Sequence, residues 1–264
     1  MSLTWSAHIS WLFGELPYLE RVGAARRAGF DWIETAWPNP HDAALLPRAV
    51  TEHGVGVALL NCPAGDVAGG ERGFINDPSR GEEAEQAFLA AADLAGRLGA
   101  RSLNLLVGRS LPGVGLARQR DCVVAVLRSL GPQAAARGLR LLLEPINALE
   151  NPGYLAPTPE DAIELIERSG VDGLGLLLDV YHVACAGGDP FMAIDRAGGL
   201  IGHVQISDWP GRGQPGSGSL DMWGILEHLG ASGYAGAVGL EYEPRGTTEA
   251  SLAFLGDERA GPLA

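Results

Sequence analysis

Short apolar runs alternate with longer stretches of helical period along the chain, and this alternation occurs eight times. The apolar runs predict strands near residues 4–9, 31–36, 55–60, 102–107, 139–144, 173–179, 200–206 and 236–241. The intervening stretches predict helices near residues 15–29, 41–53, 82–99, 116–138, 159–169, 189–198, 220–231 and 247–255. Glycines such as Gly54 and Gly99 follow helical stretches, and Thr158 followed by Pro159 has the form of a helix start.

Eight strand-then-helix units in 264 residues predict a closed (β/α)₈ TIM barrel. We expect one domain over residues 1–264, with a frayed tail at 256–264. The alternative is a doubly wound open sheet, which usually has fewer strands and a glycine-rich first turn. The first turn here reads HISWLFGELP and lacks that fingerprint, so the barrel is favoured. Two long loops, 61–81 and 207–219, are expected at its rim with functional roles.

Charge and composition exclude several classes of function. The chain has 32 acidic and 19 basic residues, a net charge of −13, and no lysine. Schiff-base aldolases, pyridoxal-phosphate enzymes, P-loop proteins and lysine-base enolases are therefore excluded. The negative charge argues against a nucleic-acid partner. We expect no membrane helix and no signal peptide, and three scattered cysteines without a CxxC pair indicate a cytoplasmic protein.

Four consecutive predicted strands end in side chains that can bind a cation. Glu144 ends the fifth strand, Asp179 ends the sixth, Gln205 lies in the seventh and Glu241 ends the eighth. TIM-barrel enzymes build their active sites at these strand ends. Converging carboxylates need a positive partner, and oxygen ligands favour Mg²⁺ or Mn²⁺ over zinc. The alternative is that Glu144 and Asp179 cap helices or pair with arginines.

Further polar residues lie near the same strand ends. His182 follows Asp179 by three residues, His203 shares a strand face with Gln205, and Asp208 lies just beyond that strand. His203 could equally contact the substrate or lie one layer deeper. His8 and Glu34, near the ends of the first two strands, also face the rim.

These segments carry a resemblance to the hydroxypyruvate isomerase family, within the xylose isomerase-like barrel superfamily. The matching segments are ISWLFGELP, NCPAGDVAGGERG at 61–73, EPIN at 144–147, LDVYH at 178–182, GHVQISD at 202–208 and GLEYEPRGTTEASL at 239–252. They extend over nearly the whole chain, and together they are specific. The resemblance implies a divalent metal bound by Glu144, Asp179, Gln205 and Glu241, with Glu144 and Glu241 also acting as the acid/base pair.

The implied reaction is a metal-dependent aldose–ketose type isomerisation in carbohydrate metabolism. A short hydroxy-oxo acid, foremost hydroxypyruvate going to tartronate semialdehyde, would react through a metal-stabilised enediolate. The resemblance leaves open which of the two glutamates removes the first proton. A 2-oxo-tetronate isomerase, a neutral ketose isomerase or epimerase, and a non-catalytic binding barrel are the alternatives. Apurinic endonucleases of the same superfamily use several histidine ligands and a basic groove, unlike this chain.

An acidic substrate needs a cationic anchor, which here must be arginine or histidine. Arg72 and Arg212 lie on the two long rim loops and suit a carboxylate, while His182 is expected to hold a substrate hydroxyl. Glu243 stands where the family usually has lysine, which leaves the exact substrate open unless Arg245 compensates. The expected partner is a small molecule, and a homo-oligomer is compatible with the sequence.

Overall fold

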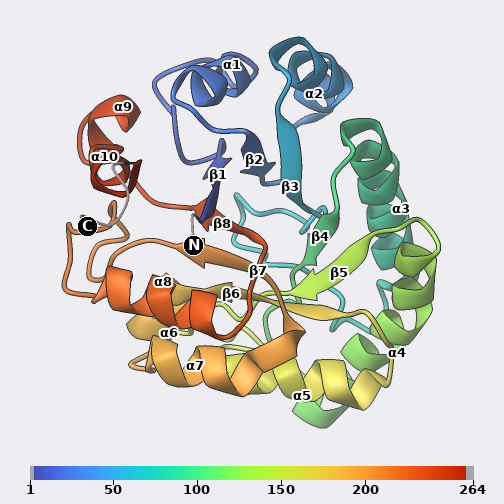
Figure 1. Cartoon of the computed structure of the whole chain (residues 1–264). Coiled ribbons are helices and arrows are strands. Elements are labelled where there is room, and N and C mark those ends of the chain that lie inside the picture. Colours follow the sequence, from blue (N-terminus) through green and yellow to red (C-terminus); the bar gives the residue numbers. More distant parts are fainter. Residues whose placement is uncertain (1–2, 260–264) are drawn as a thin grey trace.

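Eight parallel strands pair in chain order and close into a barrel, in which β1 bonds to both β2 and β8 (Figure 1). The computed structural model describes residues 3–259. The strands are β1 (Thr4–His8), β2 (Trp32–Thr35), β3 (Gly56–Asn61), β4 (Ser102–Leu105), β5 (Arg140–Leu143), β6 (Gly175–Asp179), β7 (Ile201–Ile206) and β8 (Ala237–Leu240). The predicted (β/α)₈ TIM barrel is confirmed, and each strand lies inside its predicted range or within one residue of it.

Helices surround the barrel (Figure 1). They are α1 (Glu20–Arg27), α2 (Pro40–His53), α3 (Gly81–Leu98), α4 (Leu116–Ala135), α5 (Pro159–Ser169), α6 (Val180–Cys185), α7 (Pro190–Ala197), α8 (Met222–Ala231), α9 (Thr248–Ser251) and α10 (Phe254–Arg259), with a short 3₁₀ turn at Gly198–Leu200. Among the described residues, none of these helices is long and apolar enough to cross a membrane.

The helix α6 was not predicted, and helical regions near both ends of the chain also differ from the prediction. The helix expected at 15–29 begins at Glu20, because residues 9–19 form turns. The Arg21 side chain stabilises these turns by donating hydrogen bonds to the carbonyls of Leu16 and Ile9. The helix expected at 247–255 is divided into α9 and α10 by a turn. α10 continues to Arg259, so part of the segment expected to fray is helical, and residues 260–264 lie outside the described part of the chain.

The strands hold two groups of buried side chains. A large cluster joins strands to helices, while Leu59, Leu142 and Leu177 of β3, β5 and β6 form a small separate cluster. Glycine makes room for the latter, since a Cβ at Gly202 would lie 2.3 Å from Leu142 Cδ2. Packed side chains therefore fill the barrel, as expected for eight strands.

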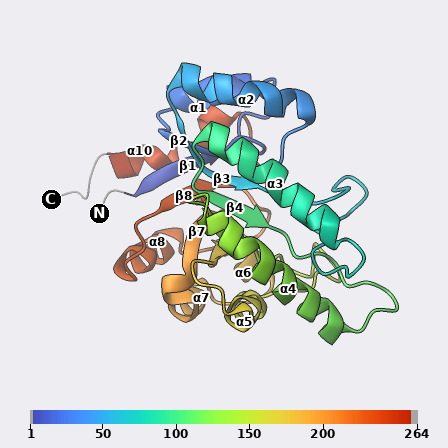
Figure 2. The same ribbon diagram turned by 90° about the vertical axis from the view of Figure 1, so that its right-hand side faces the viewer.

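Strand register places the predicted site residues at one end of the barrel. Asp179 pairs with Gln205 between β6 and β7, and the Glu241 N–H donates to the Ile206 carbonyl beyond the β7–β8 pairing. The long loops after β3 and β4 project from the same end, on the right of Figure 2. Gly73 and Val107 form a bridge between these two loops.

Candidate active site

A cavity of about 690 Å³ opens at the C-terminal ends of the strands. Its lining includes five residues singled out from the sequence, namely Glu144, Glu241, His182, Arg72 and Arg212. Asp179 and Gln205 are buried next to it, with about 1% and 2% of their surfaces exposed. The structure therefore brings together residues from β5 to β8 and from both long rim loops.

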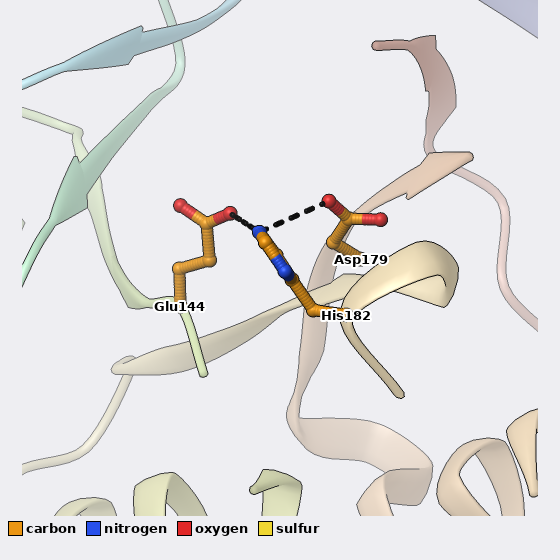
Figure 3. Close-up of side chains that lie close together, drawn as sticks. All are labelled: Glu144, Asp179 and His182. Carbon is orange, nitrogen blue, oxygen red and sulfur yellow. Dashed lines mark ion pairs between the residues drawn. The ribbon is translucent and has the colours of Figure 1, made fainter. Parts of the chain in front are cut away.

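Glu144, Asp179 and His182 form a compact buried group (Figure 3). The His182 Nε2 atom lies 3.9 Å from Glu144 Oε1 and 3.6 Å from Asp179 Oδ2. One ligand atom from each side chain lies within 4.8 Å of the other two, which is close enough to hold a cation. Asp179 also begins α6, because its Oδ1 accepts a hydrogen bond of 2.8 Å from the Tyr181 N–H. One carboxylate oxygen thus caps the helix and the other faces the cluster.

Burial dominates the acidity of the three carboxyl groups. It raises the pKa of Glu144 well above its usual range, and the neighbouring Glu241 and Asp179 raise it further. Burial also raises the pKa of Asp179 to about 7, against the opposing effect of Arg212. The pKa of Glu241 is raised for the same reason. A buried carboxyl group is stabilised either by binding a proton or by a cation close to it.

Arg212 supplies one such cation. Its Nη2 atom lies 3.2 Å from Asp179 Oδ2 and 3.4 Å from Glu241 Oε2. The guanidinium carbon lies 4.6 Å from the centre of the Trp11 ring and 5.0 Å from that of Tyr181. Burial acts to lower the pKa of Arg212, but the Glu241 and Asp179 carboxylates outweigh it and raise the pKa above its usual range.

Glu34 sets the orientation of the Gln205 amide. Its Nε2 donates a 2.8 Å hydrogen bond to Glu34 Oε1, while Glu34 Oε2 lies 2.5 Å from His203 Nε2. Burial acts to raise the pKa of Glu34, but His203 and then the Gln205 amide lower it below its usual range. An ionised carboxylate accepts hydrogen bonds, so the Gln205 amino end must face Glu34.

The oxygen end of the Gln205 amide is a candidate metal ligand. The buried Oε1 atom of Gln205 has no hydrogen-bond partner within residues 3–259. Gln205 pairs with Asp179 in strand register, and an unpartnered amide oxygen together with carboxylates is a donor set that suits a hard divalent cation. The oxygen donors expected from the sequence are chemically suited to such a cation, namely Glu144, Asp179, Gln205 and Glu241. The side chains that lie within sharing distance of one cation are Glu144, Asp179 and His182.

The remaining predicted residues lie in different surroundings. Arg72 lines the cavity, and its Nε donates a 3.0 Å hydrogen bond to Asn151 Oδ1. His203 is buried against Glu34 and is not part of the cavity lining. Asp208 organises the 207–219 loop, because its carboxylate accepts hydrogen bonds from the backbone N–H groups of Gly216 and Leu220. Glu243 is exposed, and its backbone N–H donates a hydrogen bond to the Arg212 carbonyl.

Several side chains around the carboxylates were not identified from the sequence. Asn104 of β4 donates a 2.6 Å hydrogen bond to Glu144 Oε2. Trp11 and Tyr181 enclose the Arg212 guanidinium. Asn147 contacts His182. The EPIN segment contained Asn147, but nothing in the local pattern shows which residue a loop side chain will contact.

Comparison with known proteins places the chain in a family. Residues 22–258 match the family described as xylose isomerase-like TIM barrel. The chain is similar to the hydroxypyruvate isomerase of Escherichia coli, with 34% identity covering 96% of this chain and 98% of that protein. It is also similar to the 2-oxo-tetronate isomerase of Cupriavidus necator, with 33% identity covering 95% and 96%.

A solved structure from Brucella melitensis, described as an AP endonuclease of family 2, is similar as well. Its TM-score is 0.93 at 32% identity, covering 97% of this chain and 99% of that one. The family match covers most of the chain, and curated relatives above 30% identity cover nearly all of it. The chain therefore belongs to the hydroxypyruvate isomerase family of xylose isomerase-like TIM barrels.

Proposed function

We propose that the chain is a metal-dependent isomerase of a short hydroxy-oxo acid, with hydroxypyruvate as its foremost substrate. Membership of the family makes the chain an isomerase. The observation that carries the proposal is the convergence of three buried carboxyl groups and an unpartnered amide oxygen beside one cavity. A net charge of −13 disfavours the phosphodiester substrate of an AP endonuclease.

Four side chains would hold the metal, Mg²⁺ or Mn²⁺, by oxygen atoms, namely Glu144, Asp179, Gln205 and Glu241. When bound, the cation would polarise the substrate carbonyl and stabilise the negative charge that develops as the α-proton leaves. The cluster is buried, so the surroundings exclude bulk water and strengthen electrostatic effects.

Glu144 and Glu241 are the proposed acid/base pair. Both line the cavity, and burial raises the pKa of each carboxyl group. A carboxyl group that lies beside the substrate can take and return a proton. With hydroxypyruvate, one glutamate would remove a proton from the hydroxymethyl carbon and a proton would return to the neighbouring carbon. The hydroxyl proton moves to the former carbonyl oxygen, which leaves an aldehyde and conserves all atoms.

Arginine is the proposed anchor for the substrate carboxylate. Arg72 and Arg212 both line the cavity, and a guanidinium can bond a carboxylate through two N–H groups. Glu243 is exposed and outside the cavity lining, so its negative charge lies in solvent. The site therefore keeps cationic groups for an acid although the family's lysine is replaced.

The size of the cavity favours a second candidate substrate. A volume of about 690 Å³ greatly exceeds the needs of a three-carbon acid. A four-carbon 2-oxo-tetronate would use the same cation, glutamates and arginine anchor, with more of the cavity filled. A neutral ketose could accept hydrogen bonds from Arg72 but would form no ion pair with it.

Isomerase assays on metal-depleted protein, with and without Mg²⁺ or Mn²⁺, test the proposal. Hydroxypyruvate, 2-oxo-tetronate and neutral ketoses are compared, with solvent deuterium incorporation as a second readout. We expect metal-dependent turnover of an acid, and a loss of at least about 100-fold in Glu241→Gln, since it removes an acid/base group. Glu227→Gln, on the exposed surface of α8, is the matched control.

Two results would contradict the proposal. Full activity of Glu241→Gln would remove this residue from the acid/base pair. Absence of solvent exchange on every substrate, in protein that binds Mg²⁺ or Mn²⁺, would favour a non-catalytic binding barrel.

A further inference from the structure

The His182 ring presents its two nitrogens to different surroundings. Nε2 faces the carboxylates of Glu144 and Asp179 (Figure 3), and Nδ1 lies 2.7 Å from Asn147 Nδ2. In a neutral imidazole, one nitrogen carries a proton and the other carries a lone pair. The neighbour of Nδ1 therefore decides whether Nε2 can bind a cation or can only donate a hydrogen bond.

The orientation of the Asn147 amide is fixed from its other side. Its Oδ1 accepts a 2.9 Å hydrogen bond from the Glu150 backbone N–H, and its Nδ2 donates a 3.1 Å hydrogen bond to Glu150 Oε2. A backbone N–H can only donate and a carboxylate can only accept, so both contacts require the same orientation. Asn147 is fully buried, so water does not offer it an alternative. The second hydrogen of its amino group therefore points at His182.

Glu150 is itself held in place. The Tyr181 hydroxyl donates a 2.5 Å hydrogen bond to Glu150 Oε1. Tyr181 precedes His182 in α6, and Asn147 and Glu150 lie in the loop after β5. These bonds join the loop to the helix and leave the amide little freedom to turn over.

An amino group cannot accept a hydrogen bond, so Nδ1 of His182 must be the acceptor and the ring proton must be on Nε2. We propose that Asn147 is a positioning residue that fixes His182 as a hydrogen-bond donor toward the substrate and withholds it from the cation. The role toward substrate rests on the proposed function, whereas the position of the proton does not.

His182 therefore has a different role from the two carboxylates next to it. Proximity alone would allow Glu144, Asp179 and His182 to share a cation. A metal-binding histidine, however, normally donates its other N–H to a carboxylate or carbonyl. Here the Asn147 amino group, which is a hydrogen-bond donor, lies against His182 Nδ1. The proposed ligands are therefore oxygen atoms alone, those of Glu144, Asp179, Gln205 and Glu241.

Nuclear magnetic resonance of metal-free protein containing ¹⁵N-histidine tests the proton position directly. Protonated and unprotonated ring nitrogens resonate in separate ranges, and His182→Gln identifies the signals. We expect an unprotonated Nδ1 and a protonated Nε2 in the wild type. A protonated Nδ1 would overturn the proposal, and this measurement needs no enzymatic activity.

A double variant tests the role of the amide. Asn147→Asp with Glu150→Gln places a carboxylate against Nδ1 and avoids two facing carboxylates. The Nδ1 signal should shift into the protonated range, and kcat/KM should fall by about 10- to 100-fold. Asn151→Asp with Glu150→Gln makes the same exchange of charge in this loop. In this control the new carboxylate faces Arg72, so the His182 Nδ1 signal should remain in the unprotonated range. An unprotonated Nδ1 in the folded double variant would overturn the assignment to Asn147.

Pulsed electron paramagnetic resonance of the Mn²⁺ complex tests ligation. The wild type should show no directly bonded histidine nitrogen, and the double variant should gain one. A bonded nitrogen in the wild type that is lost in His182→Gln would overturn the proposal. If no substrate is isomerised but Nδ1 is unprotonated, the proposed function fails and the role of Asn147 toward the ring stands.

Discussion

Arg212 places a permanent positive charge against two buried carboxylates. In a chain without lysine, arginine takes this place, and its planar guanidinium also contacts the rings of Trp11 and Tyr181. Its contacts with Asp179 and Glu241 offset part of the cost of burying both acids. The same group lines the cavity, so it can stabilise the site and bind substrate.

Arg212→Lys separates charge from shape at this position. Lysine keeps the positive charge but loses the two-pronged geometry and the flat surface that contacts the rings. We expect kcat/KM for the acid substrate to fall by about 10- to 100-fold, the range for losing a hydrogen bond to a charged group. Steady-state kinetics measure the change, with Arg48→Lys on the exposed surface of α2 as control. Equal kcat/KM in the two variants would show that charge is sufficient.

At the level of elements, β8 has no room for a side chain at the position where it passes Glu34. Gly239 pairs with Gln205 in register, and a Cβ at Gly239 would lie 2.3 Å from Glu34 Oε1 and 2.4 Å from Oε2. The carboxylate of β2 can therefore reach β7 only because β8 carries glycine there. This arrangement orients the Gln205 amide.

Gly239→Ala should destabilise the protein by about 1–3 kcal/mol, because the added methyl group overlaps a buried carboxylate. Gly96→Ala, in α3 with open space around it, should instead stabilise by about 0.5–1 kcal/mol through helix propensity. Urea denaturation of both variants measures the free energy of unfolding. A stabilised Gly239→Ala would contradict the role given to the glycine.

Across the whole molecule, the proposed donor oxygens lie in or directly after four successive strands. Glu144, Asp179, Gln205 and Glu241 lie near one another only when β5 to β8 are paired and the barrel is closed. A cation that binds them would therefore bind the folded chain in preference to the unfolded chain.

Mn²⁺ should consequently increase the free energy of unfolding, by about 2.7 kcal/mol at a concentration 100 times Kd, and a chelator should reverse the effect. Denaturation with increasing Mn²⁺ measures the increase. Asp179→Asn should weaken the dependence on Mn²⁺, whereas Asp93→Asn, at an exposed ion pair on α3, should not. The same dependence in both variants would show that Mn²⁺ binds elsewhere.

The sequence by itself determined the order of strands and helices, because hydrophobic periodicity is a local property. It also located Glu144, Asp179, Gln205 and Glu241 at strand ends, since a barrel directs all parallel strands toward one face. It did not reveal α6, whose residues Val180–Ala184 are all buried and give no amphipathic pattern.

Only the tertiary structure decided which side chains meet and which hydrogen bonds they form. Glu34 and Gln205 are 171 positions apart, and Arg212 is 33 positions from Asp179. No local pattern encodes these contacts, because they depend on barrel closure and on the path of the rim loops. The direction of the Asn147 amide, and with it the position of the His182 proton, follows from partners that come together only in the folded barrel.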